Sequence, residues 1–297
     1  MVKSVAVIGV GAMGMGMAHS LLRNGFRTLA RDIDPRREAL ARAAGAQVVS
    51  SAREAGAADA VAIVVVDAAQ IEQVLSGDDG LLAGLGPGRL VFLCSTIAPS
   101  DSETFAARIA ATGAQVLDAP ISGGPARAQA GTMSIMLAGP QSALDAAEPV
   151  LAAIAGKRFV IGARHGDAAR AKLVNNLMAG IHLMAGAEAL ALAIRLGLDP
   201  RQMSELIGAS SGQSWMFDDR MQRALAGDFA PRAQSHVLTK DLTLANDAAR
   251  AVGLQLPLGA LARDLLRATC EGGWRDEDDA AALKYYASRF GVTLPSS

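Results

Sequence analysis

Residues 5–25, VAVIGVGAMGMGMAHSLLRNG, join a short β-branched run to a glycine-rich turn and then to a helical pattern. In such a turn the first glycine permits the tight bend, the second lets a pyrophosphate approach the backbone, and the third lets the helix pack closely on the strand. Free N–H groups at the start of the helix attract phosphates. The stretch predicts a dinucleotide-binding turn, and an ordinary βα unit that uses glycine only for packing is the alternative. The predicted contacts are Gly9, Gly11, Ala12, Met13 and Gly14.

An acidic residue follows the second predicted strand, residues 26–30. A carboxylate about 20 residues beyond the glycine-rich turn accepts the ribose hydroxyls of the adenosine and repels a 2′-phosphate. Asp32 occupies this place, so we expect NAD to be preferred over NADP. The nearby guanidinium groups of Arg31, Arg36 and Arg37 leave NADP open, because they could hold the extra phosphate.

Short strands and helices alternate along the first half of the chain. Residues 59–66, DAVAIVVV, are apolar throughout, which is typical of a strand buried on both faces of a parallel sheet. The alternation predicts an α/β domain of the Rossmann type, in which helices cover both faces of a doubly wound sheet. The other predicted strands are residues 3–8, 26–30, 46–49, 89–93, 114–117, 132–138 and 158–161, with helices at 35–44 and 68–75 and further helices that begin at Pro99 and Pro125.

Polar residues follow several of these strands. Open parallel sheets bind ligands beyond the carboxyl ends of their strands, and Asp67, Thr96 and the loop after Asp118 are expected at that edge. The Thr96 hydroxyl suits a cofactor ribose or carboxamide, but it could also cap the helix that begins at Pro99.

A second glycine-rich turn, residues 121–125 (ISGGP), follows the strand that ends near Asp118. Two adjacent glycines after a serine can present successive backbone N–H groups to one anion. Ser122, Gly123 and Gly124 therefore form a candidate carboxylate site, and a flexible turn before the next helix is the alternative.

The sequence predicts only helices from residue 164 onward. Residues 162–197 contain strong helix formers, no proline and a terminal glycine, so we expect one long helix after a glycine-rich opening. Its apolar residues occupy nearly every face, which favours burial between packed elements. We place the boundary between an N-terminal domain, residues 1–163, and an all-helical domain, residues 164–297. Further helices are predicted at 200–208, 214–226, 235–252, 257–270 and 277–290.

The apolar part of the long helix would suffice to span a membrane. Asn175, Asn176, His182 and Glu188 interrupt it, so we expect a buried helix of a soluble protein instead.

Lys172 and Asn176 lie one turn apart on the long helix, where an amine and an amide can reach the same small molecule. Burying such a pair without a function is costly. The alternative is a lysine that extends from the helix end into solvent, beside a local irregularity. Lys240 and Asp241 begin a polar stripe in a later helix, for which a surface ion pair is the alternative.

The composition restricts the class of protein. The chain has 297 residues, of which 51% are hydrophobic, and a net charge of −1, so we expect no attraction to nucleic acid or to an anionic membrane. Cys94 and Cys270 make neither a disulfide framework nor a metal cluster. The N-terminus opens with a strand-like run and not with a signal-peptide pattern. We expect a cytoplasmic protein without a metal site.

A bound nicotinamide would require a group that handles the proton of the alcohol. A Tyr-xxx-Lys pair is absent, because Tyr285 and Tyr286 have no lysine four residues later. No cysteine and histidine grouping has the spacing of zinc ligands. His165 and Asp167 lie in a glycine-rich link that would hold them poorly, so Lys172 is the best candidate.

The chain resembles the β-hydroxyacid dehydrogenase family. The matching motifs span the chain in the family's order: VIGVGAMGMGMAHSLLRNG at 7–25, STIAPS at 95–100, DAPISGGPARAQAGTM at 118–133, GDAARAKLVNN at 166–176 and TKDLTLA at 239–245. Three further segments look most similar to members that act on sugar acids: GIHLMAGAEALALA at 180–193, SWMFDDRM at 214–221 and DEDDAA at 276–281.

The resemblance implies a role for each motif. Lys172 would be the catalytic amine, Asn176 would hold the substrate with residues 122–124, and Thr96 and Lys240 would flank the nicotinamide. It also implies homodimers or homotetramers built through the helical domain. Two departures from the family pattern are Ala168, where a second glycine is usual, and the segment Val65, Val66 and Asp67, which replaces the usual Leu-Pro contact beside the cofactor.

The implied function is hydride transfer between NAD and a small hydroxy acid, such as the four-carbon L-threonate, with Lys172 as general acid and base. Oxidation of 3-hydroxyisobutyrate, or reduction of glyoxylate or a small semialdehyde, is the first alternative. A non-catalytic nucleotide-binding module is the second.

Overall fold

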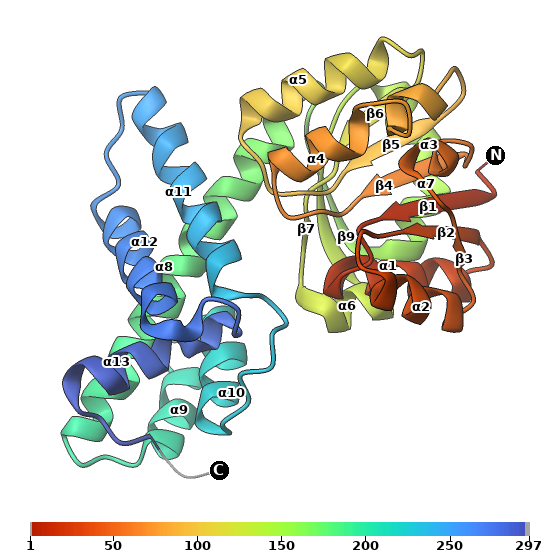
Figure 1. Cartoon of the computed structure of the whole chain (residues 1–297). Helices are drawn as coiled ribbons and strands as arrows, with labels where there is room; N and C mark the ends of the chain where they lie inside the picture. Colours follow the sequence, from red (N-terminus) through yellow and green to blue (C-terminus); the bar gives the residue numbers. More distant parts are fainter. Residues whose placement is uncertain (1, 295–297) are drawn as a thin grey trace. The chain divides into compact units, whose positions relative to one another are not determined.

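The computed structural model describes residues 2–294, and Figure 1 shows the course of the chain. The chain forms two compact units, of which the first ends at Lys172 and the second begins at Leu173. The division falls inside the long helix α8 (Asp167–Arg195). The domain boundary predicted between residues 163 and 164 lies before α8 and stays a prediction.

The first unit is built on a sheet of nine strands among the described residues. The strands β3, β2, β1, β4, β5 and β6 lie side by side in that order and run parallel. The strands are β1 (Ser4–Ile8), β2 (Arg27–Arg31), β3 (Gln47–Val48), β4 (Ala60–Ile63), β5 (Leu90–Leu93), β6 (Gln115–Asp118), β7 (Ile121–Ser122), β8 (Met133–Ala138) and β9 (Ala155–Gly162).

Helices cover both faces of this sheet. The helices are α1 (Ala12–Arg23), α2 (Pro35–Ala43), α3 (Ala52–Ala55), α4 (Ala68–Leu75), α5 (Pro99–Ala110), α6 (Gly124–Ala130) and α7 (Gln141–Ile154). Alternate side chains of a strand point to opposite faces, so Val5 and Val7 enter a core with α1, α6 and α7, whereas Ala6 and Ile8 enter a core with α3, α4 and α5. The predicted doubly wound α/β domain is confirmed, and Figure 1 shows α4 and α5 on the face opposite α1 and α6.

The first unit differs from the prediction at several places. Residues Ile121–Ser122, expected to be loop, form β7, and both β6 and β7 pair antiparallel with β8. The predicted strand at 59–66 stops at Ile63, where its partner β1 also ends at Ile8. Helix α7 was not among the predicted elements, and it contains Pro149, a residue that normally disfavours a helix interior.

The second unit consists of helices. After α8 come α9 (Pro200–Gly208), α10 (Gln222–Leu225), α11 (Ser235–Ala251), α12 (Pro257–Thr269) and α13 (Ala282–Phe290). The helices predicted at 214–226 and 277–290 are interrupted, because a π-helical turn (Phe217–Met221) precedes α10 and a 3-10 helix (Asp279–Ala281) precedes α13. The core contains the fully buried side chains of Leu183, Leu190, Leu242, Leu266 and Leu283.

Helix α8 is less buried than predicted. Val174 is 65% exposed and Leu192 is 59% exposed, so the expectation of burial on nearly every face is wrong for the single chain. By length and apolar composition, α8 is the one helix within residues 2–294 that could cross a membrane, and core helices of soluble proteins pass the same test. The apolar pattern of a helix does not show whether each of its faces packs against the same chain or against another molecule.

Candidate active site

The turn between β1 and α1 requires glycine at two positions. Gly9 has a φ of 90°, and a Cβ atom there would lie 2.4 Å from the carbonyl oxygen of Val64. A Cβ atom at Gly14 would lie 1.9 Å from the carbonyl oxygen of Gly9. No side chain fits at these distances, so the helix packs on the strand as closely as a dinucleotide-binding turn requires.

The N-terminus of α1 is suited to an anion. Gly11 is the N-cap residue, and within the described chain no side chain caps this helix and no acidic residue lies in its first turn. Uncapped N–H groups and the helix dipole both favour negative charge. The first helical residues, Ala12 and Met13, therefore fit the pyrophosphate of a dinucleotide.

Asp32 follows β2, and its side chain is held in one orientation. Oδ2 accepts a hydrogen bond of 2.8 Å from the Val10 N–H, and Oδ1 accepts one of 2.9 Å from the Asp34 N–H. The residue is buried. A fixed carboxylate at this strand end fits ribose hydroxyls better than a 2′-phosphate.

The three arginines near Asp32 differ in their ion-pair partners. Arg31 and Arg36 form ion pairs with other carboxylates, at 2.5 and 3.0 Å. Arg37 lies 4.0 Å from Asp32, and its Nη1 lies 3.1 Å from the position that a Cβ atom on Gly11 would occupy. Of the three cations considered from the sequence, Arg37 is therefore the one placed beside the phosphate-binding turn.

The loops after β4 and β5 carry Val66, Asp67 and Thr96. Asp67 caps α4 by accepting a hydrogen bond of 2.9 Å from the Gln70 N–H, and the Val66 N–H donates to the Gln70 side chain. The N-cap residue of α5 is Ala98, two residues after Thr96. Because β4 lies beside β1 and β5 beside β4, these loops follow the same edge of the sheet as the glycine-rich turn. Their contacts with a cofactor stay predictions.

The second glycine-rich turn connects β7 to α6. Gly123 has a φ of 126° and Gly124 a φ of 76°, and residues other than glycine rarely adopt such positive values. Ser122 lies opposite Ser134 in the antiparallel pair of β7 and β8. The conformation fits the predicted presentation of backbone N–H groups to a carboxylate.

Lys172 lies in the second turn of α8 and is 7% exposed. It is the only buried lysine within residues 2–294. Its amine does not extend into bulk solvent, as the alternative interpretation requires. Burial of an ammonium group in an apolar helix is costly, which favours the functional interpretation.

Asn176 and Lys240 both contact Asp241 in the second unit. Asn176 Nδ2 donates a hydrogen bond of 2.6 Å to Oδ2 of Asp241, and Lys240 Nζ lies 2.8 Å from Oδ1. The ion pair that was the alternative interpretation is therefore present, with a buried carboxylate and a partly exposed ammonium group. Asp241 was missing from the predicted site, although its place beside Lys240 in an otherwise apolar helix was a signal.

The first unit contains the predicted cofactor residues up to Thr96, the turn at Ser122–Gly124, and Lys172. The second contains Asn176 and Lys240, and α8 runs through both, with Lys172 and Asn176 one turn apart. Among the described residues, no group of three histidine, cysteine or acidic side chains is placed to hold a metal ion.

Known protein families match both parts of the chain. Residues 4–162 match the NAD binding domain of 6-phosphogluconate dehydrogenase, and residues 166–286 match the NAD-binding domain of NADP-dependent 3-hydroxyisobutyrate dehydrogenase. The chain belongs to the 3-hydroxyisobutyrate dehydrogenase family of β-hydroxyacid dehydrogenases. The predicted family and the nicotinamide cofactor are thereby confirmed.

Individual relatives of this family match over nearly the whole chain. An L-threonate dehydrogenase of Cupriavidus necator is 42% identical over 296 residues, 99% of each chain. An NAD-dependent L-serine dehydrogenase of Pseudomonas aeruginosa is 35% identical over 292 residues, 96% of this chain and 98% of that protein. The structure of a 3-hydroxyisobutyrate dehydrogenase from Salmonella typhimurium has a TM-score of 0.89 and 40% identity, and the match covers 95% of this chain and 99% of that one. The chain is an NAD(P)-dependent hydroxy-acid dehydrogenase that acts on CH–OH groups.

Proposed function

We propose that this dehydrogenase oxidises a four-carbon sugar acid of the L-threonate type, with Lys172 as the group that exchanges the hydroxyl proton. The observation that carries the catalytic role is the buried amine of Lys172, one helical turn before Asn176. The substrate class is supported by the L-threonate dehydrogenases, which are 42% and 39% identical over 99% of the chain.

Each residue of the site has a separate part in the proposed mechanism. The N–H groups of residues 122–124 bind the substrate carboxylate, and Asn176 orients the hydroxyl. Lys172 accepts the hydroxyl proton during oxidation and returns it during reduction. NAD, when bound, supplies the hydride acceptor. A lysine suits this task because its amine can lose a proton near neutral pH when its environment disfavours the charge, which a guanidinium cannot do.

NAD is the proposed cofactor in preference to NADP. Oδ2 of Asp32 accepts a hydrogen bond from the Val10 N–H of the glycine-rich turn, and Oδ1 accepts one from the Asp34 N–H, so the carboxylate is fixed beside that turn. A negative charge there disfavours a 2′-phosphate. Arg31 and Arg36 are occupied by carboxylates of their own.

A second candidate substrate is 3-hydroxyisobutyrate, favoured by the match to the Salmonella typhimurium structure of that name. Both acids carry the carboxylate and the hydroxyl that the mechanism uses, but they differ in the polarity of the remaining groups. A sugar acid requires hydrogen-bond partners for its extra hydroxyls, whereas the methyl group of 3-hydroxyisobutyrate favours an apolar pocket.

The substrate test is a panel of hydroxy acids with three to six carbon atoms, measured with NAD and with NADP by the absorbance of the reduced cofactor. We expect the highest kcat/KM for L-threonate with NAD. A higher value for 3-hydroxyisobutyrate would favour the second candidate, and no turnover with any hydroxy acid or oxo acid would contradict the proposal.

We also propose that the protein is a homodimer or homotetramer that associates through the helical domain. Ala185, Ala189, Leu192 and Leu196 follow one another at helical spacing and are exposed. A contiguous apolar stripe of this kind is typical of an interface. Light scattering after size-exclusion chromatography measures the mass, and we expect Leu192→Asp to shift it toward the monomer. A monomeric wild-type protein would contradict this proposal.

A further inference from the structure

Asp118 is a buried acidic residue that has no part in the proposed proton transfer. It is the last residue of β6 and is 0% exposed. Its Oδ1 accepts a hydrogen bond of 2.6 Å from the Ser102 hydroxyl, and its Oδ2 accepts one from the Gly166 N–H. Burial raises the pKa of the Asp118 carboxyl, and these two hydrogen bonds oppose that rise. A buried carboxyl is costly unless its hydrogen bonds are made, and one of those made here reaches the start of α8.

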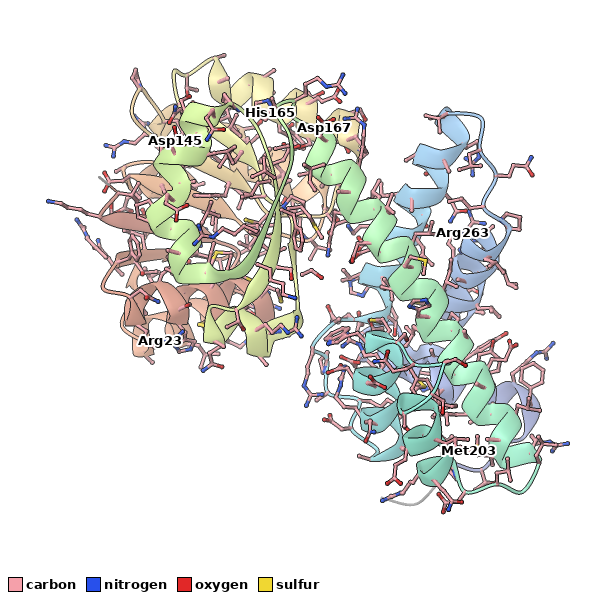
Figure 2. The ribbon with its side chains drawn as sticks, turned by 180° about the vertical axis from the view of Figure 1, so that it is seen from behind. Arg23, Asp145, His165, Asp167, Met203 and Arg263 are labelled. Atoms are coloured by element: carbon pink, nitrogen blue, oxygen red, sulfur yellow. The ribbon has the colours of Figure 1, made fainter. Side chains whose placement is uncertain are left out.

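Gly166 belongs to the turn that begins α8. Its φ is 90°, and a Cβ atom at this position would lie 2.6 Å from Oε1 of Glu103. The ring of the neighbouring His165 also contacts β6, with Nε2 3.1 Å from the carbonyl oxygen of Val116. Figure 2 shows His165 and Asp167 where the chain passes from β9 into α8. The turn is therefore tied to β6 at two points.

The first turns of α8 are also packed on the sheet. Ala168 is fully buried in a cluster with Met136 and Ala138 of β8. On the exposed side, Arg170 forms an ion pair of 2.7 Å with α5. Because protein interiors are closely packed, a helix held on both sides at its start cannot shift freely in the next turn, where Lys172 lies.

The same carboxylate also lies at the origin of the second glycine-rich turn. Asp118 pairs with Ala138 at the junction of β6 and β8. Residues 119–121 then lead directly to Ser122 and the two glycines. One buried side chain thus fixes the strand end that precedes the carboxylate-binding turn and the backbone that begins the lysine-bearing helix.

We propose that Asp118 is a positioning residue, which sets the place of the Lys172 amine relative to the substrate carboxylate held at Gly123 and Gly124. This inference rests on the proposed function of Lys172. The residue acts through the backbone of α8 and touches neither the substrate nor the reacting atoms.

Two substitutions separate geometry from charge. In Asp118→Asn the amide oxygen can accept from the Gly166 N–H while the amino group donates to the Ser102 oxygen, because a hydroxyl both donates and accepts. Asp118→Ala removes both hydrogen bonds and leaves a buried N–H without its acceptor. Asp118→Asn should therefore retain most of the kcat that Asp118→Ala loses.

The experiment measures steady-state kinetics of the full-length variants with NAD and L-threonate. We expect Asp118→Ala to lower kcat about 10- to 100-fold, because displacement of a catalytic group by about 1 Å has effects of this size. NAD affinity should not change. The pH at half-maximal kcat on the acidic limb should move in Asp118→Ala, because the amine has a new environment. Asp118→Asn should restore most of kcat and the wild-type midpoint.

Asp59→Ala is the matched control. Asp59 also accepts hydrogen bonds from backbone N–H groups, those of Lys3 at 2.9 Å and Ser4 at 3.0 Å, but at the amino ends of β1 and β4. We expect this variant to lower the temperature of unfolding without altering kcat or its pH profile. If Asp118 had a purely structural role, Asp118→Ala would likewise lower the temperature of unfolding and leave kcat and its pH profile unchanged.

The possible failures are distinguishable. If Asp118→Ala does not fold, Ser102→Ala removes one of the two hydrogen bonds, and we expect it to shift the pH midpoint in the same direction with a smaller loss of kcat. Wild-type kcat and midpoint in the folded variant would overturn the positioning role. Wild-type turnover of Lys172→Ala would instead overturn the proposed function.

Discussion

Asn176 donates a hydrogen bond of 2.6 Å from Nδ2 to Oδ2 of the buried Asp241. The Asn175 side chain donates to the amide oxygen of Asn176 at 3.0 Å. These two contacts fix which end of the amide is the donor. One N–H and one lone pair of Asn176 then stay available to orient a substrate hydroxyl.

Asp241→Ala should lower kcat/KM for the hydroxy acid about 10- to 100-fold, because a charge-assisted hydrogen bond of this kind contributes about 1.5 to 3 kcal/mol. Asp241→Asn should lose less, since its amide oxygen can still accept from Asn176. Initial rates at varied hydroxy-acid concentration give both values. Asp247→Ala, in an exposed ion pair with Arg250 on the same helix, is the control and should behave as wild type. Equal kcat/KM in Asp241→Ala and wild type would remove Asp241 from the site.

Asp32→Ser should raise kcat/KM with NADP about tenfold or more, because it removes the fixed negative charge beside the phosphate-binding turn. Adding Arg37→Ala to this variant should cancel most of the gain, since Arg37 is the cation beside Gly11. Arg36→Ala is the control, because Arg36 is held by Asp34 at 3.0 Å. The measurement is the ratio of kcat/KM for the two cofactors, and an unchanged ratio in Asp32→Ser would show that Asp32 does not face the ribose.

Gly14→Ala should destabilise the fold by about 3 kcal/mol, the upper range for overpacking, and abolish NAD binding. The new Cβ atom would lie 1.9 Å from the carbonyl oxygen of Gly9, so α1 must move away from β1. Gly86→Ala is the matched control, because a Cβ atom there meets nothing within 4 Å. Urea unfolding and NAD fluorescence titration measure the two effects. Normal NAD binding by Gly14→Ala would contradict the assigned turn.

Stability should depend on pH through Asp279. Burial raises the pKa of Asp279 to about 7 despite its ion pair of 2.5 Å with Arg220, and the unperturbed value is 3.8. Between these values the folded state retains a proton that the unfolded state releases, so this group's contribution to stability falls as pH rises from about 4 to about 7. Asp279→Asn should flatten that decline. Urea unfolding at pH 5 and pH 8 measures the difference, and an equal decline in both proteins would contradict the raised pKa.

The local elements of the first unit could be predicted because their signals are short-range. The run before Gly9, the bend and the close packing at Gly14 all lie within one stretch. The central strands are apolar throughout, as burial between two hydrophobic cores requires. The antiparallel β7 could not be predicted, because two residues carry no periodicity and their pairing depends on β8.

The site could be predicted only where one residue type carries the chemistry. Lys172 and Asn176 are visible as polar residues in an apolar helix. The contacts of Asp118 and Asp241 could not be predicted, because their hydrogen-bond partners are distant in sequence. Asp118 binds the Gly166 N–H, and Asp241 binds the Asn176 side chain. The exposure of Leu192 was also not predictable, since an apolar helix has the same pattern whether its own chain or another copy covers it.

The central claim is that the Lys172 amine exchanges the substrate proton, and Lys172→Arg tests it most directly. The guanidinium keeps the positive charge but does not deprotonate near neutral pH. The decisive measurement is kcat with saturating NAD and L-threonate, together with the NAD affinity from fluorescence titration. The account predicts that kcat falls about 10²-fold or more while NAD affinity is retained. A near-normal kcat in Lys172→Arg would contradict it.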